Sequence, residues 1–504
     1  MTEPNHATPQ IPTTPPAPAP AVPVRKSWPV GKQERRLLPL SLALGYLGFS
    51  FLLDWMGGQW MRLPGLGVTV LTAGWYGALF LYRGTAGMEK RVNQVLMGAV
   101  SLLALTFTLF SNQWFRFWNG GALVLLMAVH TWELCEGARL AWGEAGMLFE
   151  RLWLLIKGPF VRCGAFLDAI GTAKQSRNFS RSLPAVVGVA VTLPALWLVA
   201  CVLMDADALF ALVAGKALRG LEFRLGPSLG RLILAVCAAP FVFSLLYFAA
   251  HTEQKERQER ERRQWDSLPA VILLGALDAL YLFFLAVQSA ALFGDRAYLA
   301  QAGISFAEYA RSGFFQLVGL AGLNVAIILT AVWICREDRW LQRLSTALVA
   351  LTAVLLVSAA WRMTLYVSAY GLSFKRLLTY WGMGMLGILL GLTVRKVWRR
   401  EFRFFRAAAP IALAGWLVLN YANIDAIAAR YNAWQVARGS LSESAVTALL
   451  YNRQGYDGLS ILAGAIDGPD AQAVRWAGEI AAEDCESWTD WSLSAARASG
   501  WAAE

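Results

Sequence analysis

The ionisable residues inside apolar stretches are those with which this chain could do chemistry. Asp278 falls about nine residues into the apolar stretch Pro269–Phe293, and Gln288 follows ten residues later, about 15 Å along a helix. Lipid penalises ionisable side chains, so those that persist usually face a protein interior or a water-filled cavity. Asp278 is therefore the best candidate for a carboxylate that responds to a proton or a cation. The alternative is a structural carboxylate, bonded to a neighbouring helix or protonated in place.

A second group of polar residues is expected near the outer surface of the membrane. Arg362 falls late in one apolar stretch, and Glu308 lies just before another. We predict a charged cluster there, for instance Arg362 with Glu308 or Asp278. The alternative is that Arg362 extends to the interface and the nearby tyrosines, including Tyr370, form an aromatic belt. The complete candidate polar site is Asp278, Gln288, Glu308, Tyr309, Arg311, Arg362 and Tyr366.

Sequence motifs for familiar catalysis are missing from the chain. There is no HExxH, GxxxxGK[ST] or GxSxG, which disfavours zinc proteolysis, ATP hydrolysis and serine acyl transfer by the known motifs. His130 and Glu133 are three residues apart and share a helix face, but no third ligand is identifiable. The six cysteines show no CxxC or other ligand spacing and are read as buried thiols. We predict no metal and no cofactor, and we lean against an enzyme.

Long apolar stretches are the elements that must position these residues. A bilayer core of roughly 30 Å requires about 20 apolar residues of helix. A hydrophobic fraction of 57 % with only 16 % charged residues also lies outside the usual range of soluble domains. We predict an all-α polytopic bundle of about eleven spans: Leu37–Leu53, Leu66–Tyr82, Val92–Phe110, Phe117–Cys135, Leu183–Leu203, Leu229–Ala250, Pro269–Phe293, Gly313–Ile334, Leu344–Ser368, Leu377–Val394 and Ala407–Tyr421.

The net charge of +11 divides by position along the chain and indicates orientation rather than nucleic-acid binding. With the N-terminus in the cytoplasm, the N-terminal tail and the five inner connectors hold 29 of the 45 lysines and arginines. The C-terminus then lies outside. We predict a multi-pass protein of a bacterial inner membrane.

Three regions are predicted along the chain. Residues 1–36 form a Pro-rich, disordered cytoplasmic tail, 37–421 the transmembrane domain, and 422–504 an acidic, helical outer region. Within the transmembrane domain, 136–182 is a cytoplasmic interfacial segment, and its stretch 152–170 is expected to lie on the membrane because charged residues interrupt it. The alternative is that 152–170 spans the membrane, which would reverse the orientation of every later connector. The mixed-charge loop 251–267 is expected to be a solvated helical extension, or alternatively a docking site for a protein partner.

Several ordered sequence blocks resemble a bacterial family of multi-pass membrane proteins, the domain of unknown function 4173, which is close to family 4153. The blocks are FLAVQSAALFG (Phe284–Gly294), ISFAEYARSGFFQL (Ile304–Leu317), SAAWRMTLYVSAYGLSFKRL (Ser358–Leu377), NIDAIAARYN (Asn423–Asn432) and DWSLSAARA (Asp490–Ala498). The N-terminal half matches only in its hydropathy pattern. The resemblance implies a helical envelope protein without an established activity.

Transport or lipid handling, through a polar pocket among the seventh to ninth spans, is the function that these patterns favour. The first alternative is a membrane scaffold or signalling protein that binds partners through the loop 251–267 or the C-terminal region. The second is an enzyme acting on a lipid-linked substrate at the outer face, with Glu308 beside Arg362 as its acid. Membrane lipids are the expected partners, nucleic acid is not, and the oligomeric state is left open.

Overall fold

The structure, a computed structural model, is all-helical over the residues that it describes, and no strand occurs among them. These residues are 30–31, 33–57, 65–136, 146–170, 227–251, 264–292, 314–442, 455–463 and 490–503, with isolated positions in 199–216 and 446–488.

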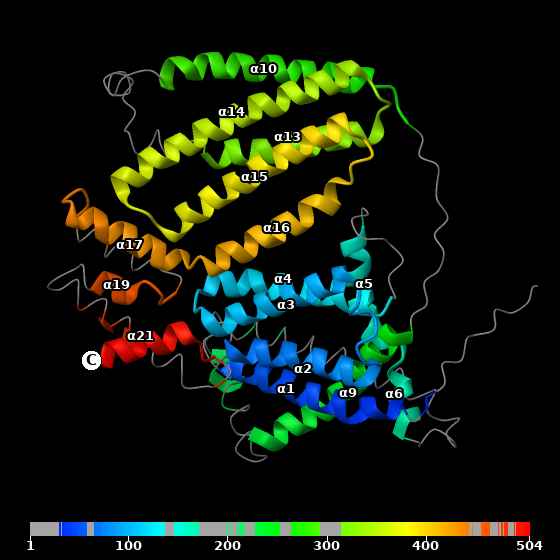
Figure 1. Cartoon of the computed structure of the whole chain (residues 1–504). Coiled ribbons are helices and arrows are strands. Elements are labelled where there is room, and N and C mark those ends of the chain that lie inside the picture. Colours follow the sequence, from blue (N-terminus) through cyan, green and yellow to red (C-terminus); the bar gives the residue numbers. More distant parts are fainter. Residues whose placement is uncertain are drawn as a thin grey trace, which may run out of the picture.

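Seven helices from the N-terminal half form a first helix group (Figure 1). Its closest packing is between α1 and α9, and α5 and α6 also pack on α9. Trp132, Phe243 and Tyr247 are central to its core. The group consists of α1 (Leu37–Gly57), α2 (Leu66–Arg83), α3 (Arg91–Leu109), α4 (Gln113–Leu134), α5 (Met147–Val161), α6 (Cys163–Ile170) and α9 (Pro227–His251).

Four later helices form a second helix group, in which α14 packs against α10, α13 and α15. Its core contains Leu274, Ile328 and Leu348, all fully buried. The group consists of α10 (Leu268–Leu292), α13 (Phe314–Ile334), α14 (Arg339–Tyr370) and α15 (Phe374–Trp398).

The helix α16 (Phe404–Tyr421) joins the two groups, because it packs on α15 in one group and on α3 in the other. The C-terminal region follows with α17 (Ile424–Ala437), α19 (Leu459–Ala463) and α21 (Leu493–Ala503). Helix α17 packs on α15, and α21 packs on α3. The C-terminal region therefore touches both helix groups.

Seven of these helices are long and apolar enough to cross a membrane: α3, α13, α14, α15, α16 and the apolar parts of α9 and α10. All seven coincide with predicted spans. Helices α1, α2 and α4 occupy three further predicted spans without being among the seven, and Leu183–Leu203 lies outside the described residues. A helical, membrane-type protein is therefore confirmed, whereas the number eleven stays a prediction.

The stretch 152–170 contains two helices, α5 and α6, rather than the single interfacial helix that we predicted. They are separated at Arg162, whose amide N–H donates to the Ser244 hydroxyl of α9 at 2.9 Å. Their 15 and 8 residues are both below spanning length. The other ends of 136–182 and most of 251–267 lie outside the described residues.

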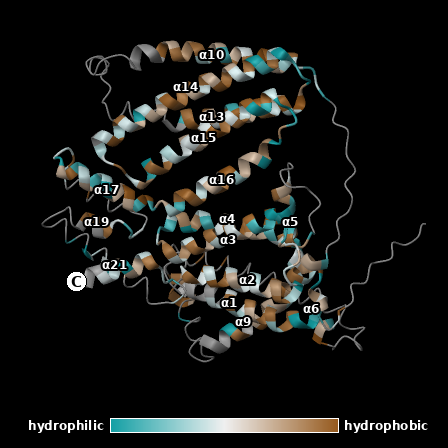
Figure 2. Cartoon of the chain, in the orientation of Figure 1, coloured by the Kyte–Doolittle hydropathy of each residue, from teal (hydrophilic) through white to brown (hydrophobic). Residues whose placement is uncertain are grey.

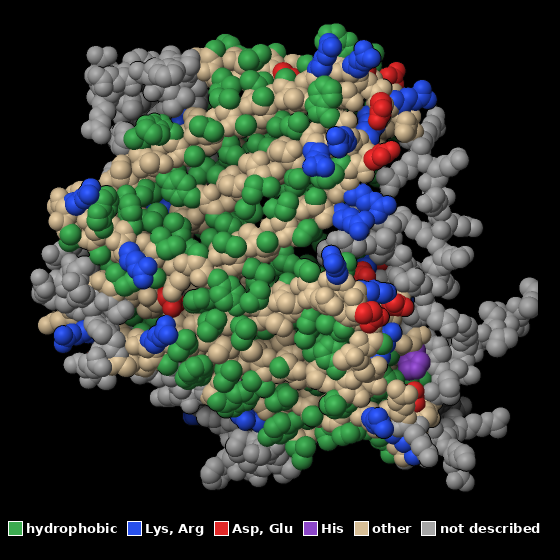
Figure 3. All heavy atoms as spheres, in the orientation of Figure 1, with side chains coloured by type: hydrophobic (Ala, Val, Ile, Leu, Met, Phe, Trp, Pro, Cys, Tyr) green, Lys and Arg blue, Asp and Glu red, His purple; other side chains and the backbone are tan. Residues whose placement is uncertain are grey.

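Hydrophilic residues gather at the ends of the helices (Figure 2), and Lys and Arg side chains are more numerous at one end than at the other (Figure 3). Lysines and arginines gather at the right of the view, where the connectors 335–343 and 395–406 lie, and hydrophobic side chains cover the band between the ends. We call this the basic end. The opposite end, where α14 finishes and α17 begins, is called the far end.

Candidate functional site

Asp278 lies in the middle of α10, about 15 Å along the helix from Leu268. Only 6 % of the residue is exposed. Neither of its carboxylate oxygens has a hydrogen-bond partner in the structure as described. A buried polar group that makes no hydrogen bond costs free energy, more so when it is charged. Most buried polar groups in proteins form hydrogen bonds, so the unpaired Asp278 carboxylate is a candidate for a functional role.

A chain of buried hydrogen bonds starts one helical turn after Asp278. The Tyr281 hydroxyl and the Asn324 Oδ1 of α13 lie 3.0 Å apart, and the Asn324 Nδ2 donates to the Thr352 hydroxyl of α14 at 2.8 Å. Thr352 donates in turn to the Leu348 carbonyl at 2.6 Å. All three side chains in the chain are buried. The apolar core of the second helix group is thus crossed by a polar layer at the level of Asp278.

Arg362 does not share this layer. It lies on α14 ten residues beyond Thr352, about 15 Å closer to the far end. The residue is buried, and its neighbours on the helix, Ala359 and Met363, belong to an apolar cluster. One version of the predicted cluster paired Arg362 with Asp278. The Asp278 carboxylate makes no hydrogen bond among the described residues, so the structure does not bring these two candidates together.

Tyr366 forms a small cluster with a residue that the sequence analysis did not single out. The Arg376 guanidinium lies 4.4 Å from the centre of the Tyr366 ring and donates to the Tyr370 carbonyl at 2.7 Å. Arg376 thereby satisfies a carbonyl at the C-terminus of α14. This arrangement favours the structural alternative, in which Tyr366 and Tyr370 belong to an aromatic belt at the membrane interface.

The other predicted site residues lie outside what the structure describes. Glu308, Tyr309 and Arg311 precede α13, and the side chain of Gln288 near the end of α10 is not described. The pairing of Arg362 with Glu308 therefore stays a prediction.

Buried polar contacts dock the C-terminal region on the far end of the first helix group. The Asn112 Nδ2 donates to the Asp425 Oδ2 of α17 at 2.7 Å, while its Oδ1 caps α4 by accepting from the Phe115 amide at 3.0 Å. The hydroxyls of Ser111 and Ser494 lie 2.9 Å apart. These bonds join two segments separated by more than 300 residues, and they lie beside an apolar cluster that contains Phe115 of α4 and Ile424 of α17.

A second contact docks the same region on the second helix group. The Asn432 amide of α17 donates to the Leu372 carbonyl and accepts from the Leu372 amide, both at 2.7 Å. Both residues are buried. This two-way bond fixes α17 against the turn between α14 and α15.

Asp457, next to the docked helix α19, lies in the same far-end junction. Burial raises the pKa of its carboxyl above the usual range. Hydrogen bonds from Ser494 and Asn423 and the positive charges of Arg116 and Arg497 act in the opposite direction but are smaller than the effect of burial.

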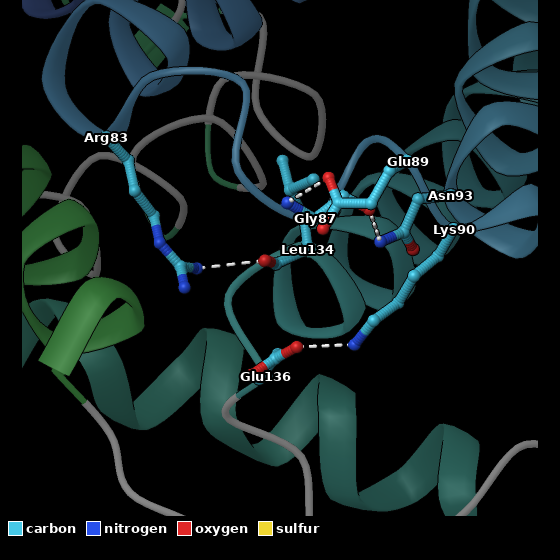
Figure 4. A network of polar contacts seen from close by, with 7 residues as sticks. All are labelled: Arg83, Gly87, Glu89, Lys90, Asn93, Leu134 and Glu136. Carbon is cyan, nitrogen blue, oxygen red and sulfur yellow. Dashed lines mark hydrogen bonds and ion pairs between the residues drawn. The ribbon is translucent and has the colours of Figure 1, made fainter.

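At the basic end, a polar network joins α2, α3 and the end of α4 (Figure 4). The Arg83 Nη1 donates to the Leu134 carbonyl at 2.9 Å, and the Asn93 amide donates to the Gly87 carbonyl at 2.7 Å. Lys90 pairs with Glu136, whose pKa the bond lowers while that of Lys90 rises. The Lys90–Glu136 pair is exposed to solvent. We therefore interpret this network as a structural contact that holds the ends of α2, α3 and α4 together.

His130 and Glu133, considered above as metal ligands, have other partners. The His130 Nδ1 lies 2.9 Å from the Tyr76 hydroxyl, and Glu133 pairs with the fully buried Arg151 of α5. No group of three or more His, Cys, Asp or Glu able to hold a metal occurs among the residues described.

Sequence reasoning missed the uncharged members of these sites. Asn324, Thr352 and Asn432 carry no charge, so a search for ionisable residues in apolar stretches passes over them. Asn324 in the otherwise apolar run LAGLNVAIIL was a usable signal, because amides inside spans bond to other helices.

Comparison with known proteins identifies a family but no activity. Residues 97–462 match the family model described as "Domain of unknown function (DUF4153)". The match includes much of the N-terminal half, which in the sequence analysis resembled the family only in its hydropathy pattern. The resemblance to family 4173, a near neighbour of DUF4153, is not confirmed. No curated protein and no solved structure matches.

Proposed function

The chain belongs to the DUF4153 family, and on that premise we propose that it is a membrane transporter or lipid-handling protein controlled by protonation of Asp278. The family description names no activity, so the proposal rests on the residues of this chain. One observation carries it: a carboxylate that has no hydrogen-bond partner among the described residues lies buried about half-way along a helix long and apolar enough to span a membrane.

A proton is the ion that best fits this carboxylate. A protein site for a metal cation needs several oxygen ligands around it, whereas a proton needs only the carboxylate itself. Protonation removes the charge whose burial is costly, and ionisation restores it. The polar layer from Tyr281 to Thr352, one turn away, supplies hydroxyl and amide groups with which an ionised carboxylate can exchange partners when α10 moves against α13 and α14.

Reaction with dicyclohexylcarbodiimide, an apolar reagent that modifies protonated carboxyl groups, tests this assignment. We expect mass spectrometry of the full chain in liposomes to locate the modification at Asp278 and to show that it decreases as the pH rises. Asp266, exposed just before α10, is the matched control and should react poorly. An Asp278 that stays unmodified at every pH in the folded chain, but reacts after denaturation, would contradict the proposal.

The scaffold alternative is favoured by a different observation. The C-terminal region is fixed on the membrane helices, and its described residues include three exposed tryptophans, Trp434, Trp476 and Trp488, which a partner protein could bury. Complementation of a deletion strain separates the two functions. Failure of Asp278→Asn with success of Asp266→Asn supports transport, whereas failure only after removal of residues 424–504 or 251–266 supports the scaffold. The enzyme alternative depends on Glu308 and stays a prediction.

A further inference from the structure

The basic end of the second helix group carries more positive charge than its acids neutralise. The connectors 335–343 and 395–406 contain nine lysines and arginines and three acids. Glu337 pairs with Arg400 at 3.5 Å, and Asp338 accepts hydrogen bonds from the Ser267 hydroxyl at 2.6 Å and the Trp340 amide at 2.8 Å. Two of the three acids are therefore already engaged.

Arginines that remain exposed at this end make no ion pair among the residues described. They are Arg336, Arg339, Arg343, Arg395, Arg399, Arg403 and Arg406. Like charges gathered on one surface repel one another unless counter-charges accompany them. In water, dissolved ions supply that counter-charge; at the surface of a membrane, lipid headgroups do.

Hydrogen bonds hold the two connectors against each other. Arg400 donates to the carbonyl oxygens of Cys335 and, at 2.9 Å, Arg336. The indole of Trp398, at the end of α15, donates to the Thr346 hydroxyl of α14 at 3.0 Å. The arginines thus stand on a fixed surface, which lowers the entropic cost of binding a ligand.

Three of the arginines share one face of this surface. Arg339, Arg343 and Thr346 are spaced four and three residues apart on α14, so they lie on one helix side. The bond from Trp398 to Thr346 brings the end of α15, and with it Arg399, to that side. Arg339 and Arg343 lie in the first turns of α14, where the helix dipole disfavours cations and favours an anion.

Exposed aromatic residues place this face at the depth of lipid headgroups. Trp340 and Trp398 are more than half exposed, as is Trp265, whose backbone pairs with Cys335, and tryptophans of this kind gather at the membrane–water interface. The Arg343 guanidinium lies 5.5 Å from the centre of the Trp340 ring. The guanidinium fork matches phosphate geometry with two parallel hydrogen bonds, and its lipid-level position selects a phosphate that is attached to acyl chains.

We propose that the face formed by Arg339, Arg343 and Arg399, flanked by Trp340 and Trp398, binds the phosphate of an anionic phospholipid. Basic groups between transmembrane helices are suited to such headgroups. The inference is independent of Asp278, which lies deeper in the same helix group.

Lipid binding to the purified full chain, counted by native mass spectrometry, tests the proposal with phosphatidylglycerol and phosphatidylcholine as probes. Each arginine near an anionic surface contributes about fivefold in affinity, so the variant Arg339→Gln/Arg343→Gln/Arg399→Gln should bind phosphatidylglycerol on the order of a hundredfold more weakly. Its weak binding of phosphatidylcholine should not change.

Two controls separate a site from a general effect of charge. The variant Arg35→Gln/Arg36→Gln/Arg91→Gln removes the same charge from exposed positions outside the proposed face, two just before α1 and one at the start of α3, and should keep most of the binding. A loss equal to that of the first variant would overturn the proposal, as would displacement of the lipid by inorganic phosphate. If the glutamine variant does not fold, the three Arg→Lys changes decide. A several-fold loss is then expected because lysine cannot form the paired bonds, and unchanged binding would overturn the proposal.

Discussion

The Asn112 amide donates to the Asp425 carboxylate at 2.7 Å across 313 residues of sequence, and so joins the start of α4 to the start of α17. Asp425 is in the first turn of α17, where a carboxylate is stabilised by the helix dipole. One side chain therefore serves two helices, because the Oδ1 of Asn112 also caps α4.

Replacing Asn112 should loosen the C-terminal region. We expect Asn112→Ala to lower the stability of the junction by about 1–3 kcal/mol, because it removes a helix cap and takes one donor away from the half-buried Asp425 carboxylate. Asn112→Ser keeps a capping oxygen and should lose less. Limited proteolysis within residues 424–504 measures the change, and equal cleavage rates in the wild type and Asn112→Ala would show that the contact contributes nothing.

Protonation of Asp457 should strengthen the same junction. Because burial raises its folded pKa, the native state binds the proton more tightly than the unfolded chain does. Protonated Asp457 therefore adds to the free energy of unfolding at low pH. This contribution is lost as the pH rises from the pKa of Asp457 in the unfolded chain through its raised pKa in the folded chain. Hydrogen exchange of α19 and α21 should slow on acidification. In Asp457→Asn, which cannot titrate, that part of the pH dependence should vanish; if it persists, another group is responsible.

The buried layer in the second helix group should make a modest contribution to stability. Tyr281→Phe removes one hydrogen bond to Asn324, and interhelical bonds in membranes contribute about 0.6 kcal/mol on average. Asn324→Ala removes two bonds and leaves a small gap, so we expect a loss of about 1–3 kcal/mol. Thermal unfolding in detergent compares the variants. A larger loss of stability in Tyr281→Phe than in Asn324→Ala would contradict this interpretation, because Asn324 makes two of these bonds and Tyr281 only one.

The bonds in the network of Figure 4 should contribute unequally to the stability of the fold. Lys90→Ala breaks an exposed ion pair, and we expect a change of about 0–1 kcal/mol, smaller still at high salt. Asn93→Ala removes a buried donor from the Gly87 carbonyl and should cost about 1–3 kcal/mol. The same unfolding measurement made at two salt concentrations distinguishes them, since only the first effect should depend on salt.

Much of the fold was predictable from apolar stretches of spanning length. All seven helices that are long and apolar enough to cross a membrane coincide with predicted spans, because hydropathy over some 20 residues reports the lipid environment directly. The break of 152–170 at Arg162 was not foreseen. It depends on the tertiary bond from its backbone to Ser244, which a reading of local sequence does not contain.

The candidate site was less predictable, for a physical reason. Burial of Asp278 followed from its position in an apolar stretch, but the absence of a partner for its carboxylate depends on how α10 is rotated against α13 and α14. The docking of the C-terminal region was left open by the sequence. Its contacts use asparagine and serine, whose partners lie hundreds of residues away and have no local pattern.

The attachment of α16 determines how the two helix groups can move. Near the far end, the Trp416 indole donates to Asn119 Oδ1 at 2.7 Å, and the Tyr421 hydroxyl donates to the Leu102 carbonyl at 2.8 Å. The C-terminal region adds its own bonds to both groups at that end. Polar bonds at the far end therefore hold the two helix groups together, and a rotation of one group about these bonds would displace its basic end the most.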